Sequence, residues 1–94
     1  MNMDEDKKTP LMSQKIFQLN LPVETTSIYI LCCSLADNEE PISTKNIQKI
    51  WNGSQEALLN GLEKLEKRNI LRKIISDQEG NSVYRLMSDA KWKF

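Results

Sequence analysis

The stretch PISTKNIQKIWNGSQEALLNGLEKLEKRNILRKI, residues 41–74, decides the fold because it reads as two short helices joined by a tight turn. Ser43 or Thr44 can cap the first helix and Ser54 the second, since a side-chain hydroxyl accepts from the free N–H groups of a first helical turn. Gly53, in the turn between them, tolerates the positive φ that such a turn can demand. The spacing therefore predicts a compact helical pair.

The second helix of this pair, expected over residues 54–68, has two distinct faces. One face is apolar at spacings of three and four, and the opposite face is polar. The apolar positions are Leu58, Gly61, Leu62 and Leu65, and the polar ones are Glu56, Asn60, Glu63 and Lys67. Asn69 can adopt the left-handed conformation that ends a helix. We expect the leucines to point into the core and Asn60 to point outward.

An earlier helix is expected within residues 22–41, where apolar residues recur at helical spacing. Its middle is apolar on most sides, so we expect it to be the central helix, covered on most sides. Residues 11–20 before it are expected to form a short strand or an extended arm on the body. Residues 1–14 are interpreted as a mobile polar leader, and residues 15–94 as the domain. In the short helix that follows Pro41, Ile47, Ile50 and Trp51 give an apolar face, and Trp51 is expected to fill the core.

Two β-rich segments follow Asn69. Residues 70–77 and 81–87 flank the sequence QEGN, a combination typical of a hairpin with a glycine-containing loop. A lone hairpin is marginally stable, so it must pack on the helices. The predicted fold class is therefore α+β, mainly helical: three helices around one core with a two- or three-stranded sheet.

Composition limits the chain to one ordinary domain. It has 94 residues, of which 28% are charged. No run approaches the ~20 apolar residues of a membrane span, and polar residues 1–10 do not resemble a signal peptide. These features favour a cytoplasmic protein without a membrane partner. Residues 1–40 hold seven acidic and three basic side chains, a net −4, whereas residues 41–94 hold six acidic and ten basic ones, a net +4.

The residues of this chain that could act in catalysis or bind a metal are few. Cys32 and Cys33 are adjacent, and helical neighbours point about 100° apart, which is unsuited to a mutual disulfide. The chain has no histidine to complete a zinc site. We interpret both cysteines as small buried hydrophobes. Without a phosphate-cradling glycine loop or a carboxylate pair in an evident cleft, we expect no enzyme, no metal and no cofactor.

The predicted order of helix, short strand, helix, turn, helix and hairpin resembles that of a winged helix-turn-helix domain. Residues 41–74 are similar to the pattern of small bacterial regulators of the MarR and related families. The residues that carry this similarity are Thr44, Ser54, Leu62, Leu65, Glu66, Asn69, Ile70, Leu71 and Arg72. Asn69 replaces the usual glycine, a tolerable exchange at a left-handed position.

The preceding segment LPVETTSIYILCCSLAD, residues 21–37, also resembles the N-terminal winged-helix domains of plasmid and phage replication initiators and of primosomal DnaD-like proteins. Tyr29 and residues 31–36 occupy the matching positions. Together the similarities cover about residues 15–87. They imply a DNA-binding winged-helix protein, either a transcriptional regulator or a replication accessory factor.

The resemblance implies that residues 54–68 enter the major groove while the hairpin touches the DNA backbone or the minor groove. Gln55 and Asn60 suit bidentate contacts to adenine, and Leu59 suits a thymine methyl group. Lysines and arginines would contact phosphates. The full set of candidate DNA-binding residues is Thr44, Lys45, Lys49, Ser54, Gln55, Glu56, Leu59, Asn60, Lys64, Arg72, Lys73 and Arg85.

An alternative function is contact with another protein. Glu56 and Glu63 on the expected recognition helix would be repelled by phosphates, and the loop at residues 77–81 is acidic. Leu59, Trp92 and Phe94 are apolar residues that we expect could be exposed and could meet a protein partner. A homodimer is compatible with either function, because dimers double the contacts that a small regulator makes with DNA.

Overall fold

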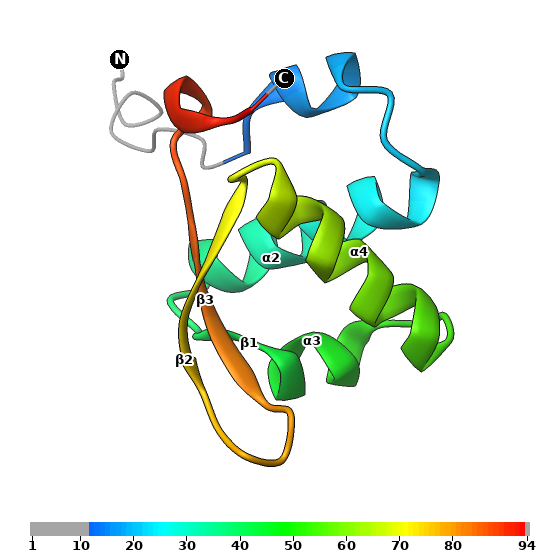
Figure 1. Cartoon of the computed structure of the whole chain (residues 1–94), viewed down its shortest axis with the longest axis vertical. Helices are drawn as coiled ribbons and strands as arrows, with labels where there is room; N and C mark the ends of the chain where they lie inside the picture. Colours follow the sequence, from blue (N-terminus) through cyan, green and yellow to red (C-terminus); the bar gives the residue numbers. More distant parts are fainter. Residues whose placement is uncertain (1–11, 94) are drawn as a thin grey trace, which may run out of the picture.

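A computed structural model describes residues 12–93 as three helices packed with a small antiparallel sheet (Figure 1). The elements in chain order are a 3₁₀ turn η1 (Gln14–Gln18), helix α2 (Val23–Asp37), strand β1 (Ile42–Ser43), helix α3 (Thr44–Ile50), helix α4 (Gln55–Lys67), strand β2 (Leu71–Ser76), strand β3 (Ser82–Leu86) and a 3₁₀ turn η2 (Asp89–Lys91). The α+β prediction is confirmed, and the topology is consistent with a winged helix.

The sheet has three strands in the order β1-β3-β2, all antiparallel. Strand β1 lies in the connection between α2 and α3, where Ile42 pairs with Tyr84 of the central strand. The hairpin forms the wing, here defined as β2, β3 and the loop between them. Strand β2 is an edge strand, and its register against β3 shifts between Lys73 and Ile75, as at a β-bulge. The predicted hairpin is confirmed.

The caps that the sequence predicts hold the helix pair. Ser43, not Thr44, caps α3 by accepting from Asn46 N at 3.1 Å. Ser54 caps α4 by accepting from Ala57 N, also at 3.1 Å. Asn69 has a φ of 59°, and Ile70 N donates to Leu65 O, which closes the end of α4.

Gly53 acts differently from the prediction, because its φ is not positive. The indole ring of Trp51 lies over it, so a Cβ at this position would be 2.6 Å from Trp51 Cζ2. Trp51 Nε1 donates to Ser54 O at 2.8 Å. Trp51 is therefore partly buried at the rim of the core and fixes the turn, whereas we predicted that it fills the core.

The core is built where α4 packs on α2. Leu58, Leu62 and Leu65 of α4 are buried, as the spacing predicts. Gly61 sits against Thr25 and Ile28 of α2, where a larger side chain would collide with Ile28. The remaining buried hydrophobic residues lie in η1, α2, α3 and the sheet or directly beside an element: Ile16, Leu19, Ile28, Tyr29, Cys32, Cys33, Leu35, Ile42, Ile47, Ile70, Leu71, Tyr84 and Trp92.

Residues 12–21 correct the prediction of a strand or an extended arm. They contain η1, which buries Ile16 against the body. Ser13 N donates to the Tyr29 hydroxyl at 2.9 Å, and Ser13 Oγ donates to Asp89 Oδ2 at 2.8 Å. The predicted leader falls mostly on residues 1–11, which lie outside the described residues, as does Phe94.

Two exposure predictions are wrong. Trp92 is buried: its ring and the Tyr29 ring form a T-shaped contact with 5.7 Å between centroids, and its Nε1 donates to Met87 O. Ile50 is exposed and does not join the core. Helix α2 is covered on most sides, as predicted: ten of its fifteen residues are buried or partly buried, and Ile30 is the exposed apolar residue in its middle. Within residues 12–93, no helix combines the length and apolar character needed to cross a membrane.

The buried leucines of α4 should dominate the stability of the fold. Leu62→Ala or Leu65→Ala should lower the free energy of unfolding by about 2–5 kcal/mol, because each removes buried methyl groups and leaves a cavity. Leu59→Ala, on the exposed side of the same helix, should change it by under about 1 kcal/mol. Urea titration followed by circular dichroism measures both, and equal losses at positions 59 and 62 would contradict this core.

Candidate nucleic-acid interface

The outward face of α4 is free of the protein body. Gln55, Glu56, Leu59 and Asn60 are all exposed there. The Asn60 amide makes no hydrogen bond within residues 12–93, so its donor and acceptor are available together. Gln55 differs, because its Oε1 accepts from Gln48 Nε2 of α3 at 3.1 Å. Asn60 is therefore better prepared than Gln55 for a bidentate contact to a base edge.

The acidic residues on this face are not equivalent. Glu63 lies 3.9 Å from Lys67 Nζ, one turn further along the helix, so part of its charge is compensated. Both side chains are well exposed, and such a pair contributes little to stability. Among residues 12–93, Glu56 has no ion-pair partner. Lys64, one turn after Asn60, places a cation beside the polar face.

Helix α3 contributes two exposed lysines and one buried threonine. Lys45 and Lys49 are exposed. Thr44, by contrast, is buried; its hydroxyl accepts from Ser82 N at 3.1 Å and contacts Ser82 O at 3.4 Å. The predicted DNA contact of Thr44 does not fit this burial, and the residue instead ties α3 to the wing. Ser54 is exposed but is engaged as the cap of α4.

The wing carries a cluster of cations that lack acidic partners. Arg72 and Arg85 are direct cross-strand neighbours, and Lys73 is opposite Tyr84. With Ile74, these three basic residues line one shallow depression. None of the three forms an ion pair within residues 12–93. Like charges directly opposite each other destabilise a sheet, and an anion bound between Arg72 and Arg85 would relieve that repulsion.

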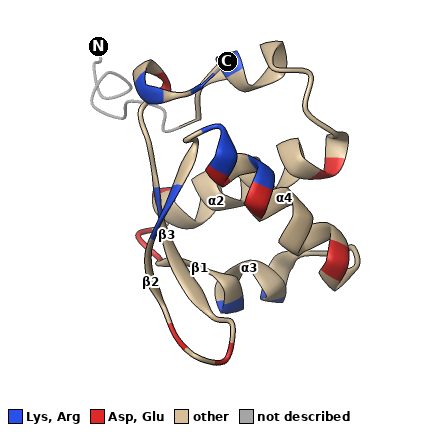
Figure 2. Ribbon diagram, viewed as in Figure 1, with Lys and Arg blue, Asp and Glu red and all other residues tan. Residues whose placement is uncertain are grey.

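Figure 2 shows how these charges are distributed over the elements of the fold. Lysines and arginines lie at the end of α4 and along the strands of the wing, and α3 adds its lysines below, while acidic residues mark the wing tip. Of the sequence-predicted cations, the strand register brings Arg72 and Arg85 directly together. The pairing of Arg72 with Arg85 follows from strand register, which the sequence pattern does not fix.

The acidic wing tip has a structural role in part. Asp77 accepts from Asn81 N and from Glu79 N, each at 2.9 Å, and from Asn81 Nδ2 at 3.2 Å. These bonds, first of all the one from Asn81 N, together with nearby Lys45, hold the pKa of the Asp77 carboxyl below its usual value. Gly80 supplies the positive φ of 88° that the loop requires. Asp77 thus shapes the loop rather than facing a ligand.

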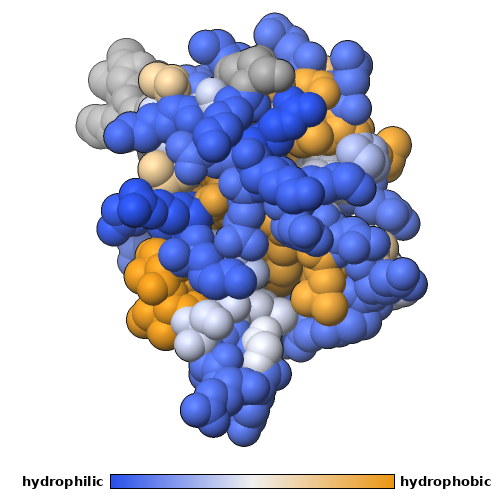
Figure 3. Space-filling view, viewed as in Figure 1, coloured by the Kyte–Doolittle hydropathy of each residue, from blue (hydrophilic) through white to orange (hydrophobic). Residues whose placement is uncertain are grey.

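Exposed isoleucines on the wing were missed by sequence reasoning. Ile74 and Ile75 are 52% and 62% exposed on the edge strand β2. Figure 3 shows hydrophobic patches interrupting an otherwise hydrophilic face. Alternation of apolar and polar residues along a strand would show which side chains face outward. In β2 this alternation is broken at the bulge, where the register shifts. The sequence therefore does not show that Ile74 and Ile75 are exposed.

Cys32 and Cys33 are buried and form no disulfide. Burial raises the pKa of the Cys32 thiol to about 12 and also raises that of Cys33. A thiol with a raised pKa holds little thiolate near neutral pH and is a poor nucleophile or metal ligand. Residues 12–93 contain no cluster of three or more side chains suited to holding a metal ion.

Comparisons with known proteins give no match: none with the models of protein families, none with the curated proteins and none with the solved structures.

Removal of the Thr44 hydroxyl should destabilise the fold without changing the exposed face. Thr44→Val leaves the buried Ser82 N–H without its acceptor, so we expect a loss of about 1–3 kcal/mol in unfolding free energy. Thr44→Ser keeps the hydroxyl and should lose clearly less. Thermal melting of both variants measures the difference, and equal losses would show that the hydroxyl has no such role.

Proposed function

We propose that the protein binds double-stranded DNA, with α4 in the major groove and the wing against the backbone, as a transcriptional regulator or a replication accessory factor. The observation that carries this proposal is the cross-strand pair of Arg72 and Arg85 on the wing, unpaired within residues 12–93, together with the free polar face of α4. Phosphates are the anions that such a flat, exposed basic surface suits.

The contacts divide by chemistry. Asn60 pairs with an adenine edge, and Leu59 meets a thymine methyl group. Phosphate contacts come from α3, from α4 and from the wing. The proposed phosphate-contacting residues are Lys45, Lys49, Lys64, Arg72, Lys73 and Arg85. These contacts set affinity and orientation, whereas α4 sets sequence preference.

Glu56 lowers the affinity of this surface for DNA and also contributes to its sequence selectivity. A carboxylate in the major groove is repelled by phosphates but accepts from cytosine N4. It therefore lowers affinity for DNA in general more than for a site with cytosine at that position. Glu63 opposes binding less, because Lys67 lies beside it.

A second candidate function is docking of another protein on the wing. The observation that favours it is the exposure of Ile74 and Ile75 on β2, an edge strand whose outer backbone groups pair with no other strand among residues 12–93. An extended peptide can add to such an edge through main-chain hydrogen bonds. The bulge between Lys73 and Ile75 limits the length of that pairing.

Titration of random duplex DNA across a salt series tests the first proposal. Affinity should fall steeply with salt, by a slope of about 0.9 per phosphate neutralised. The double variant Arg72→Ala/Arg85→Ala should weaken binding and reduce the slope by about 2. Lys15→Ala removes a lysine that is paired with Asp89, away from this face, and serves as control. Absence of any retardation at ~50 mM salt would contradict DNA binding and favour the protein partner.

Two substitutions on α4 separate base reading from general affinity. Asn60→Ala should reduce the preference for a selected site by about 1–3 kcal/mol and leave nonspecific affinity almost unchanged. Glu56→Lys should raise nonspecific affinity and steepen the salt dependence. Site selection from a random library, followed by fluorescence anisotropy, measures both. If neither substitution alters binding to DNA, α4 is not the surface in use.

A further inference from the structure

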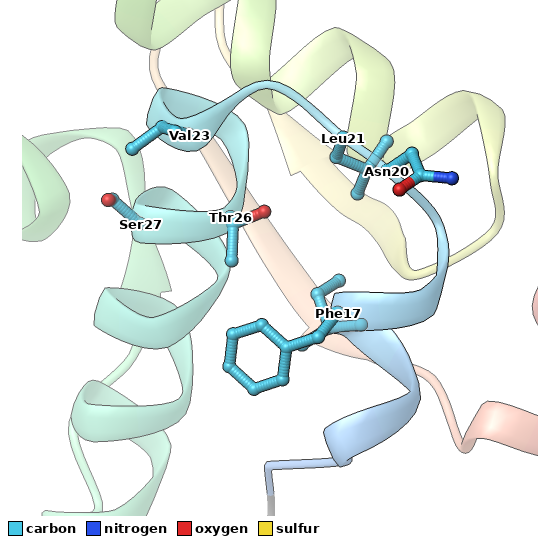
Figure 4. Close-up of a pocket in the computed structure, with 7 residues that line it drawn as sticks. Phe17, Asn20, Leu21, Val23, Thr26 and Ser27 are labelled. Atoms are coloured by element: carbon cyan, nitrogen blue, oxygen red, sulfur yellow. The ribbon is translucent and has the colours of Figure 1, made fainter.

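Two exposed junctions between elements differ in how far their side chains are fixed. At the first, η1 meets α2, and Figure 4 shows the Phe17 ring extending toward α2 near Thr26. The groove there has a volume of about 350 Å³, and no feature of residues 12–93 indicates what it would hold. At the second, α3 meets α4, and the side chain of Gln48 is bonded to that of Gln55.

The bond between the two glutamines has a direction. Gln48 Nε2 donates to Gln55 Oε1 at 3.1 Å, and both side chains are exposed. The backbone between them is also fixed, because Trp51 Nε1 donates to Ser54 O and Ser54 caps α4. Gln55 is the first residue of α4. Its amide is therefore held in one orientation at the end of the helix that we place in the major groove.

This orientation decides which atoms of Gln55 are free. A side-chain amide has one acceptor oxygen and two N–H donors. The oxygen of Gln55 is already engaged by Gln48, whereas Nε2 makes no hydrogen bond within residues 12–93. Oε1 keeps a second lone pair, but an acceptor shared between two donors makes weaker bonds than a free one. Gln55 therefore offers mainly its donors to a ligand.

We infer that Gln48 is a positioning residue that makes Gln55 select guanine over adenine, an inference that rests on the proposed placement of α4 in the major groove. Guanine presents two acceptors there, N7 and O6, whereas adenine presents one acceptor and one donor. A free glutamine suits adenine because it offers a donor and an acceptor side by side. With its acceptor held by Gln48, the same residue suits the edge that needs donors alone.

The bond acts on base selection more than on stability. Both glutamines are exposed, so water competes for their amides in the free protein and the net stabilisation is small. In the groove the base displaces that water, and a hydrogen bond is stronger in the less polar surroundings. The bond also orders Gln55 before binding, which lowers the entropic cost of the contact. Loss of Gln48 should therefore leave the fold intact.

Site selection from a random duplex library, followed by anisotropy with single base-pair changes, tests the inference. Gln55→Ala should remove the preference at one base pair, which identifies the pair that Gln55 reads. The wild type should prefer guanine over adenine there by about fivefold or more. Gln48→Ala frees Oε1 and should shift the preference at that pair toward adenine, with the salt dependence on random duplex unchanged.

Two further variants separate the bond from the bulk of the side chain. Gln48→Glu keeps the size of the residue but has no donor for Gln55 Oε1, so it should also lose the guanine preference. Gln18→Ala removes an exposed glutamine of η1 and should leave base selection as in the wild type. In the free protein, Gln48→Ala should move the side-chain amide resonances of Gln55 in proton–nitrogen correlation spectra and leave the melting profile unchanged.

The outcomes distinguish this inference from the proposed function. A wild type that prefers adenine at the pair read by Gln55 would overturn the role of Gln48 while DNA binding stands. The same holds for a Gln48→Ala variant that retains guanine, and for a Gln55→Ala variant that loses preference at no base pair. A protein that retards no duplex at all would overturn the proposed function and this inference together.

Discussion

The close approach of α4 to α2 at Gly61 is the contact on which the rest of the structure depends. A side chain at this position would press against the end of the Ile28 side chain, so Ile28 would have to shift for a larger residue to fit between the two helices. With this contact formed, Leu58, Leu62 and Leu65 are directed into the core, and Asn60 is directed to solvent. Gly61 thus lets the leucine face of α4 pack closely on α2.

Local chemistry made most of the fold predictable. The capping serines, the leucine spacing of α4, the left-handed Asn69 and the glycine-containing hairpin are read from neighbouring residues, and the structure confirms each. What failed depended on distant partners. Trp92 is buried against the ring of Tyr29, which is far away in sequence, and η1 buries Ile16 on the body. The short helix α3 does not bury Ile50, since none of residues 12–93 covers that side.

The sequence predicted which residues the candidate site contains, but it did not predict how the fold arranges them on the surface. Spacing along α4 placed Asn60 and Leu59 outward without knowledge of the fold. The opposition of Arg72 and Arg85 depends on strand register, and the burial of Thr44 depends on its bonds to Ser82. A net charge of zero also hides the unpaired cations of the wing, because all acidic residues except Asp77 and Glu79 lie outside the wing. Whether a neutral protein attracts an anion is a question of local charge.

The hydrogen bond from Ser13 to Asp89 joins positions 76 residues apart, and the ring of Trp92 rests on Tyr29 beside it. The first and last described segments are therefore neighbours, as Figure 1 also shows. Because these two segments are neighbours, the chain could be circularly permuted. A short linker would join the two segments, and new chain ends would be placed in the exposed loop around Gly80. Such a permutation would leave the packing of α2 on α4 intact while freeing the two wing strands from their covalent connection.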